Sequence, residues 1–346
     1  MFSNTITRAT LALCVLCVSA LGFIGCGNNA GGEIRLQGAG ATFPNPLYQK
    51  WLSEYGKLNA NVKIDYQSIG SGGGIKQIQA RTVDFGASDA PMKDADLKAA
   101  PGEILHIPTV LGAVVITYNL AGVSKPLHFS PEVIADIFLG KIKKWSDPKI
   151  KTDNAGVSLP DADITVVHRS DGSGTTFVFT DYLTKVNKGW TLGANAAVKW
   201  PVGLGAKGSE GVTGQVKNTE YSVSYVELIF AVQNKIGYGS VQNADGQFVK
   251  ADTKTVSAAA AGAAKSMPAD YRVSIVNAPG KESYPISTFT WLLIPSKIDD
   301  PAKKKNLVEF LHWMLKDGQS SAAGLGYAPL PSNVAKMVDK SISQVQ

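Results

Sequence analysis

The stretch HRSDGSGTTFVF, residues 168–179, is the segment from which the fold of this chain is most readily inferred. An apolar run ends at Arg169, a turn of small residues follows, and an apolar helical pattern starts near Thr176. Small residues let a backbone approach a ligand closely and point its N–H groups inward. The first turn of a helix adds free N–H donors and the positive end of the helix dipole. The stretch therefore predicts a strand, a turn and a helix that together can hold an anion.

Two further stretches repeat this design: GAGATFPNP, residues 38–46, and IGSGGGIKQI, residues 69–78. The hydroxyls that the three turns offer to an anion are Thr42, Ser71, Ser173 and Thr175. One such turn is common in α/β proteins, but three favour a shared anion site. The second stretch lacks the Gly-Lys-Ser/Thr ending of a nucleotide P-loop, and none has the glycine spacing of a dinucleotide fingerprint.

Two charged groups stand close to these turns. The planar guanidinium of Arg169 matches an oxyanion, and Asp171 is near enough in sequence to orient it. An ordinary surface ion pair is the alternative interpretation. Asp89 ends VDFGASD and precedes Ala-Pro, which by itself is the position of an ordinary loop acid.

Short apolar runs alternate with helical patterns along the body of the chain, which predicts an α/β fold with largely parallel sheets. The predicted strands are residues 34–37, 62–66, 83–87, 104–118, 164–168, 236–241 and 289–294. The predicted helices are residues 46–55, 75–81, 131–139, 176–186, 221–233, 256–266 and 302–316. With 346 residues, the chain is long enough for roughly two domains.

The composition excludes several classes of protein. Hydrophobic residues make up 44% and charged residues 18%, which is typical of a globular chain rather than a disordered one. The 34 Lys and Arg against 28 Asp and Glu give a formal net charge of +6 without a basic block, so we expect no nucleic-acid partner. The 4 histidines are scattered without ligand spacing, so we expect no metal and no cofactor.

The N-terminus has the pattern of an export signal. Residues 1–8 are polar with one positive charge, and residues 9–25 are uncharged and mostly apolar, which predicts a signal peptide over residues 1–25. Cys26 follows Ile-Gly as in a bacterial lipobox, so we expect cleavage before Cys26, a lipid on its thiol and a tether over residues 26–33. An ordinary secretory signal with an incidental cysteine is the alternative. No cysteine follows Cys26, so the exported body folds without disulfides.

The chain closely resembles the periplasmic phosphate-binding proteins of phosphate-specific ABC importers. The motifs that carry the resemblance are GAGATFPNPLYQKW, IGSGGGIKQI, VDFGASDAP, LGKIKKW, HRSDGSGTTFVF, KWPVGLGAKG, YPIS and FLHWMLKDG, in the order of that family over residues 34–346. The resemblance implies a two-lobed, type II periplasmic binding protein fold with a ligand cleft between the lobes. Lobe one would comprise residues 33–109 plus 287–346, and lobe two residues 110–286, with crossings near residues 108–112 and 284–287.

The resemblance also implies the role of each site residue. Thr42 would donate through its hydroxyl and backbone N–H, Asp89 would accept a proton from the ligand, and Arg169 would bind the oxyanion while Asp171 holds it. The implied phosphate contacts are Thr42, Phe43 through its backbone N–H, Ser71, Asp89, Arg169, Ser173, Gly174 and Thr175. Gly72 departs from the second serine that the family often has there, and His168 would lie behind the contacts.

The expected function is high-affinity binding of inorganic phosphate and its delivery, by hinge closure, to an ABC permease in the inner membrane. We expect a monomer without enzymatic activity, anchored through lipidated Cys26 in the periplasm or at the cell-envelope surface. Residues 139–145, LGKIKKW, with Lys141–Lys144 at their centre, are either a docking patch or an ordinary basic turn. The alternatives are a secreted phosphatase, which needs a nucleophile with a base or a metal pair, a binder of arsenate or molybdate, and a surface adhesion module.

Overall fold

The computed structural model describes residues 32–123 and 125–346 of the chain. The predicted signal peptide and Cys26 lie outside these residues. In the part that the structure describes, no helix has both the length and the apolar character needed to cross a membrane. Residues Glu33–Gln346 form one compact unit, and the fold is that of this unit.

A nine-stranded sheet runs through the unit in the order β2-β1-β3-β12-β4-β8-β6-β7, with β9 paired to β4. Its strands are β1 (Ile34–Gly40), β2 (Val62–Ser68), β3 (Phe85–Ser88), β4 (Ile104–Tyr118), β6 (Thr165–Arg169), β7 (Leu204–Ala206), β8 (Ser222–Glu227), β9 (Gly237–Tyr238) and β12 (Ser287–Pro295). A second, three-stranded sheet contains β5 (His128–Phe129), β10 (Ser240–Gln242) and β11 (Phe248–Val249).

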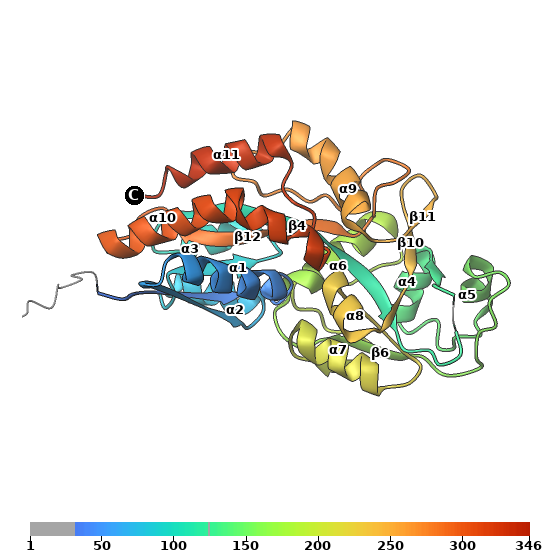
Figure 1. Ribbon diagram of the computed structural model, residues 1–346. Coiled ribbons are helices and arrows are strands. Elements are labelled where there is room, and N and C mark those ends of the chain that lie inside the picture. The colour runs from blue at the N-terminus through green and yellow to red at the C-terminus, as the bar shows by residue number, and fades with distance from the viewer. Residues whose placement is uncertain (1–31, 124) are drawn as a thin grey trace, which may run out of the picture. The chain divides into compact units, whose positions relative to one another are not determined.

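Strand β4 joins the two halves of the large sheet, as its long arrow in Figure 1 shows. It pairs with β12 over Ile104–Ala113 and with β8 over Val114–Tyr118. Its sequence, ILHIPTVLGAVVITY, is almost continuously apolar and almost completely buried, as a strand covered on both faces must be. We call β2, β1, β3 and β12 the first half of the sheet, and β8, β6 and β7 the second half.

Helices cover both halves. The helices are α1 (Asn45–Leu58), α2 (Ser71–Gln79), α3 (Asp94–Ala99), α4 (Pro131–Phe138), α5 (Pro148–Asp153), α6 (Gly174–Val186), α7 (Gly208–Asn218), α8 (Leu228–Asn234), α9 (Thr253–Lys265), α10 (Pro301–Lys316) and α11 (Ser332–Ile342), with short 3-10 turns at Gly318–Ser321 and Ala323–Leu325. Helices α1, α2 and α10 pack on the first half, and α6, α7 and α8 on the second (Figure 1).

The predicted α/β class is confirmed, but the prediction of a largely parallel sheet is wrong at its centre. Strand β1 is parallel to β2 and β3, and β6 is parallel to β7 and β8. Strand β12 is antiparallel to both β3 and β4, and β4 is antiparallel to β8. The outer strands belong to strand–helix–strand units, which are parallel, whereas β4 and β12 carry the chain into the second half and back.

Two element predictions are also wrong. The predicted helix over residues 221–233 is strand β8 followed by the short helix α8, and the predicted strand over residues 236–241 is divided between β9 and β10. The run SVSYVE of β8 is buried at every position between β4 and β6. Its residues Ser-Val-Ser-Tyr alternate between polar and apolar with the period of a strand, and the continuous apolar run LIFAV begins only in α8.

Gly74 provides a test of how α2 is placed on the sheet. A Cβ atom at this position would lie 2.6 Å from the Ala87 carbonyl oxygen and 2.6 Å from the Gly40 Cα. We therefore expect Gly74→Ala to lower the free energy of unfolding by about 1–3 kcal/mol, because the helix must move off the sheet. Urea denaturation measures this change.

The matched control is Gly262→Ala in α9, where no heavy atom lies within 4 Å of the new Cβ. Alanine reduces the entropy of the unfolded chain and favours the helix, so we expect a gain of about 0.5–1 kcal/mol. The same effect at both positions would contradict the close approach of α2 to β1 and β3.

Candidate functional site

The three turns identified in the sequence lie in one region of the structure. The Gly72 N–H donates to the Gly172 carbonyl at 2.9 Å, and a Cβ on Gly174 would lie 2.7 Å from Asp89 Oδ2. The second and third turns are therefore in direct contact. The first turn contacts the second directly, because the Gly70 N–H donates to the Gly40 carbonyl at 2.8 Å. It reaches the third through Ser209, whose hydroxyl lies 2.7 Å from the Thr42 hydroxyl and accepts from Arg169 Nη1 at 3.3 Å.

The first turn is held by its carbonyl groups. Three consecutive carbonyls accept hydrogen bonds: Ala41 from the Tyr66 hydroxyl at 2.6 Å, Thr42 from the Asn45 N–H at 3.2 Å, and Phe43 from the Tyr327 hydroxyl at 2.6 Å. In a trans peptide the N–H points opposite to the carbonyl of the same unit. The N–H groups of Thr42 and Phe43 are thereby directed away from Tyr66 and Asn45. The Phe43 ring itself is buried core, packed on Tyr327 with ring centroids 6.1 Å apart.

The second turn places Ser71, the first residue of α2, against Asp89. The Ser71 hydroxyl oxygen accepts from the Asp89 N–H at 3.2 Å and lies 3.4 Å from Asp89 Oδ2. The Thr290 hydroxyl donates to Asp89 Oδ1 at 2.8 Å. Asp89 is only 1% exposed, and burial raises its pKa to about 7, although the Thr290 hydrogen bond and the Arg169 charge act in the opposite direction. This acid therefore exchanges its proton close to neutral pH.

The third turn leaves a buried hydroxyl without a partner. The Ser173 N–H donates to the Ala196 carbonyl at 2.8 Å, and the Ser173 hydroxyl oxygen caps α6 by accepting from the Thr176 N–H at 3.0 Å. The next two N–H groups, of Gly174 and Thr175, are in the first helical turn, which has no internal acceptor for them. Within residues 32–123 and 125–346, no group hydrogen-bonds the buried Thr175 Oγ1. A group of this kind costs about 1–3 kcal/mol when unsatisfied, which favours a polar ligand beside it.

Arg169 and Asp171 form a bidentate ion pair. Nε donates to Oδ1 at 2.7 Å and Nη2 to Oδ2 at 2.6 Å, while Nη1 donates to the Ser209 hydroxyl at 3.3 Å. The Arg169 side chain is only 2% exposed. Burial acts to raise the pKa of Asp171, but the hydrogen bonds and charge of Arg169 hold it below its usual value. Asp171 thus fixes the guanidinium and leaves Nη1 to donate to Ser209.

Sequence reasoning missed a fourth helix start, that of α7. The Ser209 N–H donates to the Thr42 hydroxyl at 3.2 Å, and the Gly208 N–H donates to Asp171 Oδ1 at 3.1 Å. The signal was present in KWPVGLGAKG, which ends in a glycine at φ 71° before a serine. The strand before it, β7, has only 3 residues, so the strand–turn–helix pattern was hidden. Thr290 was also missed, because it lies 201 residues from Asp89 in the chain.

The remaining predicted neighbour, His168, stacks on Trp200 with ring centroids 5.3 Å apart. Its Nδ1 lies 3.1 Å from the Arg169 carbonyl oxygen, and burial lowers its pKa. Among the residues that the structure describes, no group of three His, Cys, Asp or Glu side chains is arranged to hold a metal ion.

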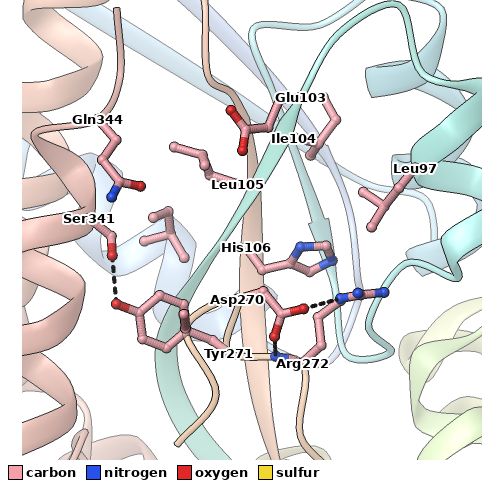
Figure 2. A pocket seen from close by; sticks show the side chains of 12 residues that line it. Leu97, Glu103, Ile104, Leu105, His106, Asp270, Tyr271, Arg272, Ser341 and Gln344 are labelled. Atoms are coloured by element: carbon pink, nitrogen blue, oxygen red, sulfur yellow. Dashed lines mark hydrogen bonds and ion pairs between the residues drawn. The ribbon is translucent and has the colours of Figure 1, made fainter.

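A separate cavity of about 440 Å³ contains none of the predicted site residues (Figure 2). Its arginine and its histidine already have partners. Arg272 pairs with Asp270 at 2.8 Å and with Asp94 at 2.6 Å, and His106 Nε2 accepts from the Met92 N–H at 3.0 Å. The cavity therefore offers less to an anion than the cleft turns do.

Comparison with known proteins places the chain in a family. A family model described as a PBP superfamily domain matches residues 27–317. The phosphate-binding protein PstS of Pasteurella multocida (strain Pm70) is 46% identical over 306 residues, which are 88% of each chain. PstS of Haemophilus influenzae is 44% identical over 307 residues, 88% of this chain and 91% of the relative. The chain belongs to the PstS family of phosphate-binding proteins.

Solved structures confirm the predicted fold of this PstS-family chain. A periplasmic phosphate-binding protein solved with phosphate aligns at a TM-score of 0.73 and 22% identity, over 89% of this chain and 94% of its own. A phosphate-binding protein from Stenotrophomonas maltophilia aligns at a TM-score of 0.69 and 21% identity, over 88% and 93%. The two-lobed periplasmic binding protein fold expected from the resemblance is therefore confirmed.

The buried carboxyl of Asp89 predicts a specific dependence of stability on pH. Its pKa is 3.8 in the unfolded chain and about 7 in the folded protein, so between these values the folded state binds more protons. Stability attributable to this group is therefore present at low pH and falls as pH rises from about 4 to about 7. Asp89→Asn removes the titration.

We expect phosphate-free wild-type protein to lose about 3 kcal/mol more unfolding free energy between pH 4.5 and pH 7.5 than Asp89→Asn does. Urea denaturation at the two pH values measures the difference, in which the titrations common to both proteins cancel. Equal losses of unfolding free energy in the wild type and in Asp89→Asn would contradict the raised pKa of Asp89.

Proposed function

We propose that this PstS-family chain binds inorganic phosphate between its three turns and delivers it to an ABC importer in the inner membrane. The observation that carries the proposal is a buried acid, Asp89, placed among groups that otherwise suit an anion. The proposed contacts are Thr42, Phe43, Ser71, Asp89, Arg169, Ser173, Gly174 and Thr175, with Asp171 holding Arg169. The proposal includes no catalytic step, metal or cofactor.

The donors provide what a desolvated anion needs. Burying an anion is costly unless each of its oxygens accepts hydrogen bonds. Neutral N–H groups from helix starts and hydroxyls such as that of Thr175 can supply most of them. Arg169 adds formal positive charge, part of which Asp171 neutralises at 2.6 Å. The arrangement stabilises the ion through many short-range donors rather than through a strong net charge.

Asp89 makes the site specific for an ion that carries a proton. Phosphate carries at least one proton near neutral pH. A hydrogen bond between phosphate and Asp89 can therefore form whether the shared proton comes from the ion or from the Asp89 carboxyl. Sulfate carries no proton, so it binds only if Asp89 itself is protonated. A site whose buried polar groups are left unpaired by the wrong ligand can discriminate by about 10⁴-fold.

Closure of two lobes would bring the donors together. We infer that the chain divides into the two lobes expected from the sequence. Lobe one comprises residues 33–109 plus 287–346, and lobe two comprises residues 110–286. In support, β4 changes its partner from β12 to β8 between Ala113 and Val114. The Thr42–Ser209 and Gly72–Gly172 contacts would then be contacts between lobes. Phosphate that touches both lobes stabilises the closed form by its differential affinity.

The cellular setting is part of the same proposal. A lipid on Cys26 would anchor a monomer in the periplasm or at the cell-envelope surface, where it could meet the permease. The basic segment at residues 139–145 stays a candidate docking patch. Lys141 lies 3.4 Å from Asp136 and Lys144 lies 3.0 Å from Asp161, so both of these cations already have acidic neighbours.

The selectivity of the site is tested with Asp89→Asn. The asparagine amide can donate to sulfate without any titration, so at pH 8, where about a tenth of the Asp89 carboxyls are protonated, we expect the preference of phosphate over sulfate to narrow by about tenfold. In the wild type, we expect sulfate affinity to fall by about tenfold for each pH unit above neutral, because the protonated fraction of Asp89 falls at that rate. Isothermal titration calorimetry of phosphate-stripped protein measures both ions.

The matched control is Asp94→Asn, which changes the same functional group on the exposed helix α3. We expect it to leave both affinities unchanged. The proposal would fail if wild-type protein bound no phosphate, or if Asp89→Asn kept the wild-type preference.

A further inference from the structure

Ser209 is a buried serine at the start of α7 that the proposed phosphate contacts do not include. It is only 1% exposed, and it lies between two of those contacts. Its hydroxyl oxygen is 2.7 Å from Thr42 Oγ1 and accepts from Arg169 Nη1 at 3.3 Å. Its backbone N–H donates to Thr42 Oγ1 at 3.2 Å. One serine thus links a hydroxyl of the first turn to the buried cation at the end of β6.

The residue after Ser209 holds this part of α7 against the first half of the sheet. Glu210 Oε1 accepts from Asn45 Nδ2 at 3.3 Å and from the Ser68 hydroxyl at 3.2 Å. Asn45 begins α1 and Ser68 ends β2, so both donors lie next to the first turn in the fold. The short distance between Ser209 and Thr42 is therefore supported by neighbouring contacts on the same side of the helix start.

The direction of the hydrogen bonds in this group follows from counting donors. A serine or threonine hydroxyl has one proton to donate and two lone pairs with which to accept. In the described part of the chain, both hydrogen bonds of the Thr42 hydroxyl are with Ser209. If the Ser209 O–H donates to Thr42, both lone pairs of Thr42 are occupied and its own proton is left for a ligand. If Thr42 donates instead, its proton is used on Ser209 and does not reach a ligand.

The charge of Arg169 favours the first of these directions when the ligand is an anion. The N–H of Arg169 Nη1 lies on the Ser209 oxygen, and a hydroxyl that accepts from a cation becomes a stronger donor. With Ser209 donating to Thr42, and Thr42 donating to the anion, every hydrogen bond points from the cation towards the anion. The reverse order would turn a lone pair of Thr42, rather than its proton, towards the negative charge.

We propose that Ser209 is a positioning residue for the phosphate site, which holds the Thr42 hydroxyl as a donor and links it to Arg169. We call this series of bonds, from Arg169 through Ser209 to Thr42, the hydroxyl relay. It rests on the proposed function, because phosphate is the ion that accepts from Thr42. Since Thr42 is then a donor only, the phosphate oxygen beside it carries no proton, and the proton of the ion is left to Asp89.

The test compares Ser209→Thr with Ser209→Val, read as the phosphate dissociation constant by calorimetry on stripped full-length protein. The two new side chains have nearly the same shape and differ in the hydroxyl, so an effect of shape acts on both. We expect Ser209→Val to bind phosphate about tenfold more weakly than Ser209→Thr. In a Thr42→Val background the hydroxyl of residue 209 has nothing to orient, so we expect the same two variants to differ by less than about twofold.

The matched control is Thr213→Val, which removes another buried hydroxyl from α7. The Thr213 hydroxyl donates to the Ser209 carbonyl at 2.7 Å and takes no part in the hydroxyl relay, so we expect phosphate affinity within about twofold of wild type.

Equal phosphate affinities of Ser209→Thr and Ser209→Val would overturn the hydroxyl relay while leaving phosphate binding intact. A tenfold difference that persisted in the Thr42→Val background would also overturn it, because the hydroxyl of residue 209 would then act without Thr42. Wild-type protein that binds no phosphate would overturn the proposed function and the hydroxyl relay together.

If Ser209→Thr or Ser209→Val does not unfold cooperatively in urea, wild type and Ser209→Ala replace that pair. The hydroxyl relay then requires Ser209→Ala to bind phosphate about tenfold more weakly than wild type, and the two to agree within about twofold when both carry Thr42→Val. Wild-type affinity in Ser209→Ala would overturn it.

Discussion

The site depends on keeping one guanidinium buried, charged and aligned at the same time. A lone buried charge costs several kcal/mol, and Asp171 offsets that cost for Arg169 through two short hydrogen bonds. The same carboxylate accepts from the Gly208 N–H, and the close approach of Asp171 Oδ2 to Gly70 leaves no room for a side chain there. The second turn, the third turn and the start of α7 are thus all built around a single ion pair.

The protein also buries two acids, and burial favours their protonated forms. Asp89 and Glu227 are both buried acids whose pKa values are raised, chiefly by burial. Asp89 has hydroxyl donors from Thr290 and Ser71 and is placed to share a proton with a ligand. Glu227 caps helix α8 by accepting from the Ile229 N–H. Asp89 would thus discriminate among ions.

The local parts of this arrangement could be predicted from the sequence, and the long-range parts could not. The apolar run of β4 gave its bounds directly, because a strand buried on both faces has a continuous hydrophobic signal. The three glycine-rich turns before helices were equally readable. By contrast, β8 was mistaken for a helix although its Ser-Val-Ser-Tyr alternation has the period of a strand, because the apolar run of α8 follows it directly.

The same distinction holds within the site. Arg169 and Asp171 are two residues apart, so their pairing was visible in the sequence. Ser209 and Thr290 contact the site from 167 and 201 residues away, and only the folded sheet brings them there.

A crystal structure of the full-length protein grown with inorganic phosphate tests the central claim most directly. The account predicts one tetrahedral ion that touches Asp89, the Arg169 guanidinium and the Thr175 hydroxyl together. Phosphate found only outside this cleft, for example against Arg272 in the cavity of Figure 2, would contradict it.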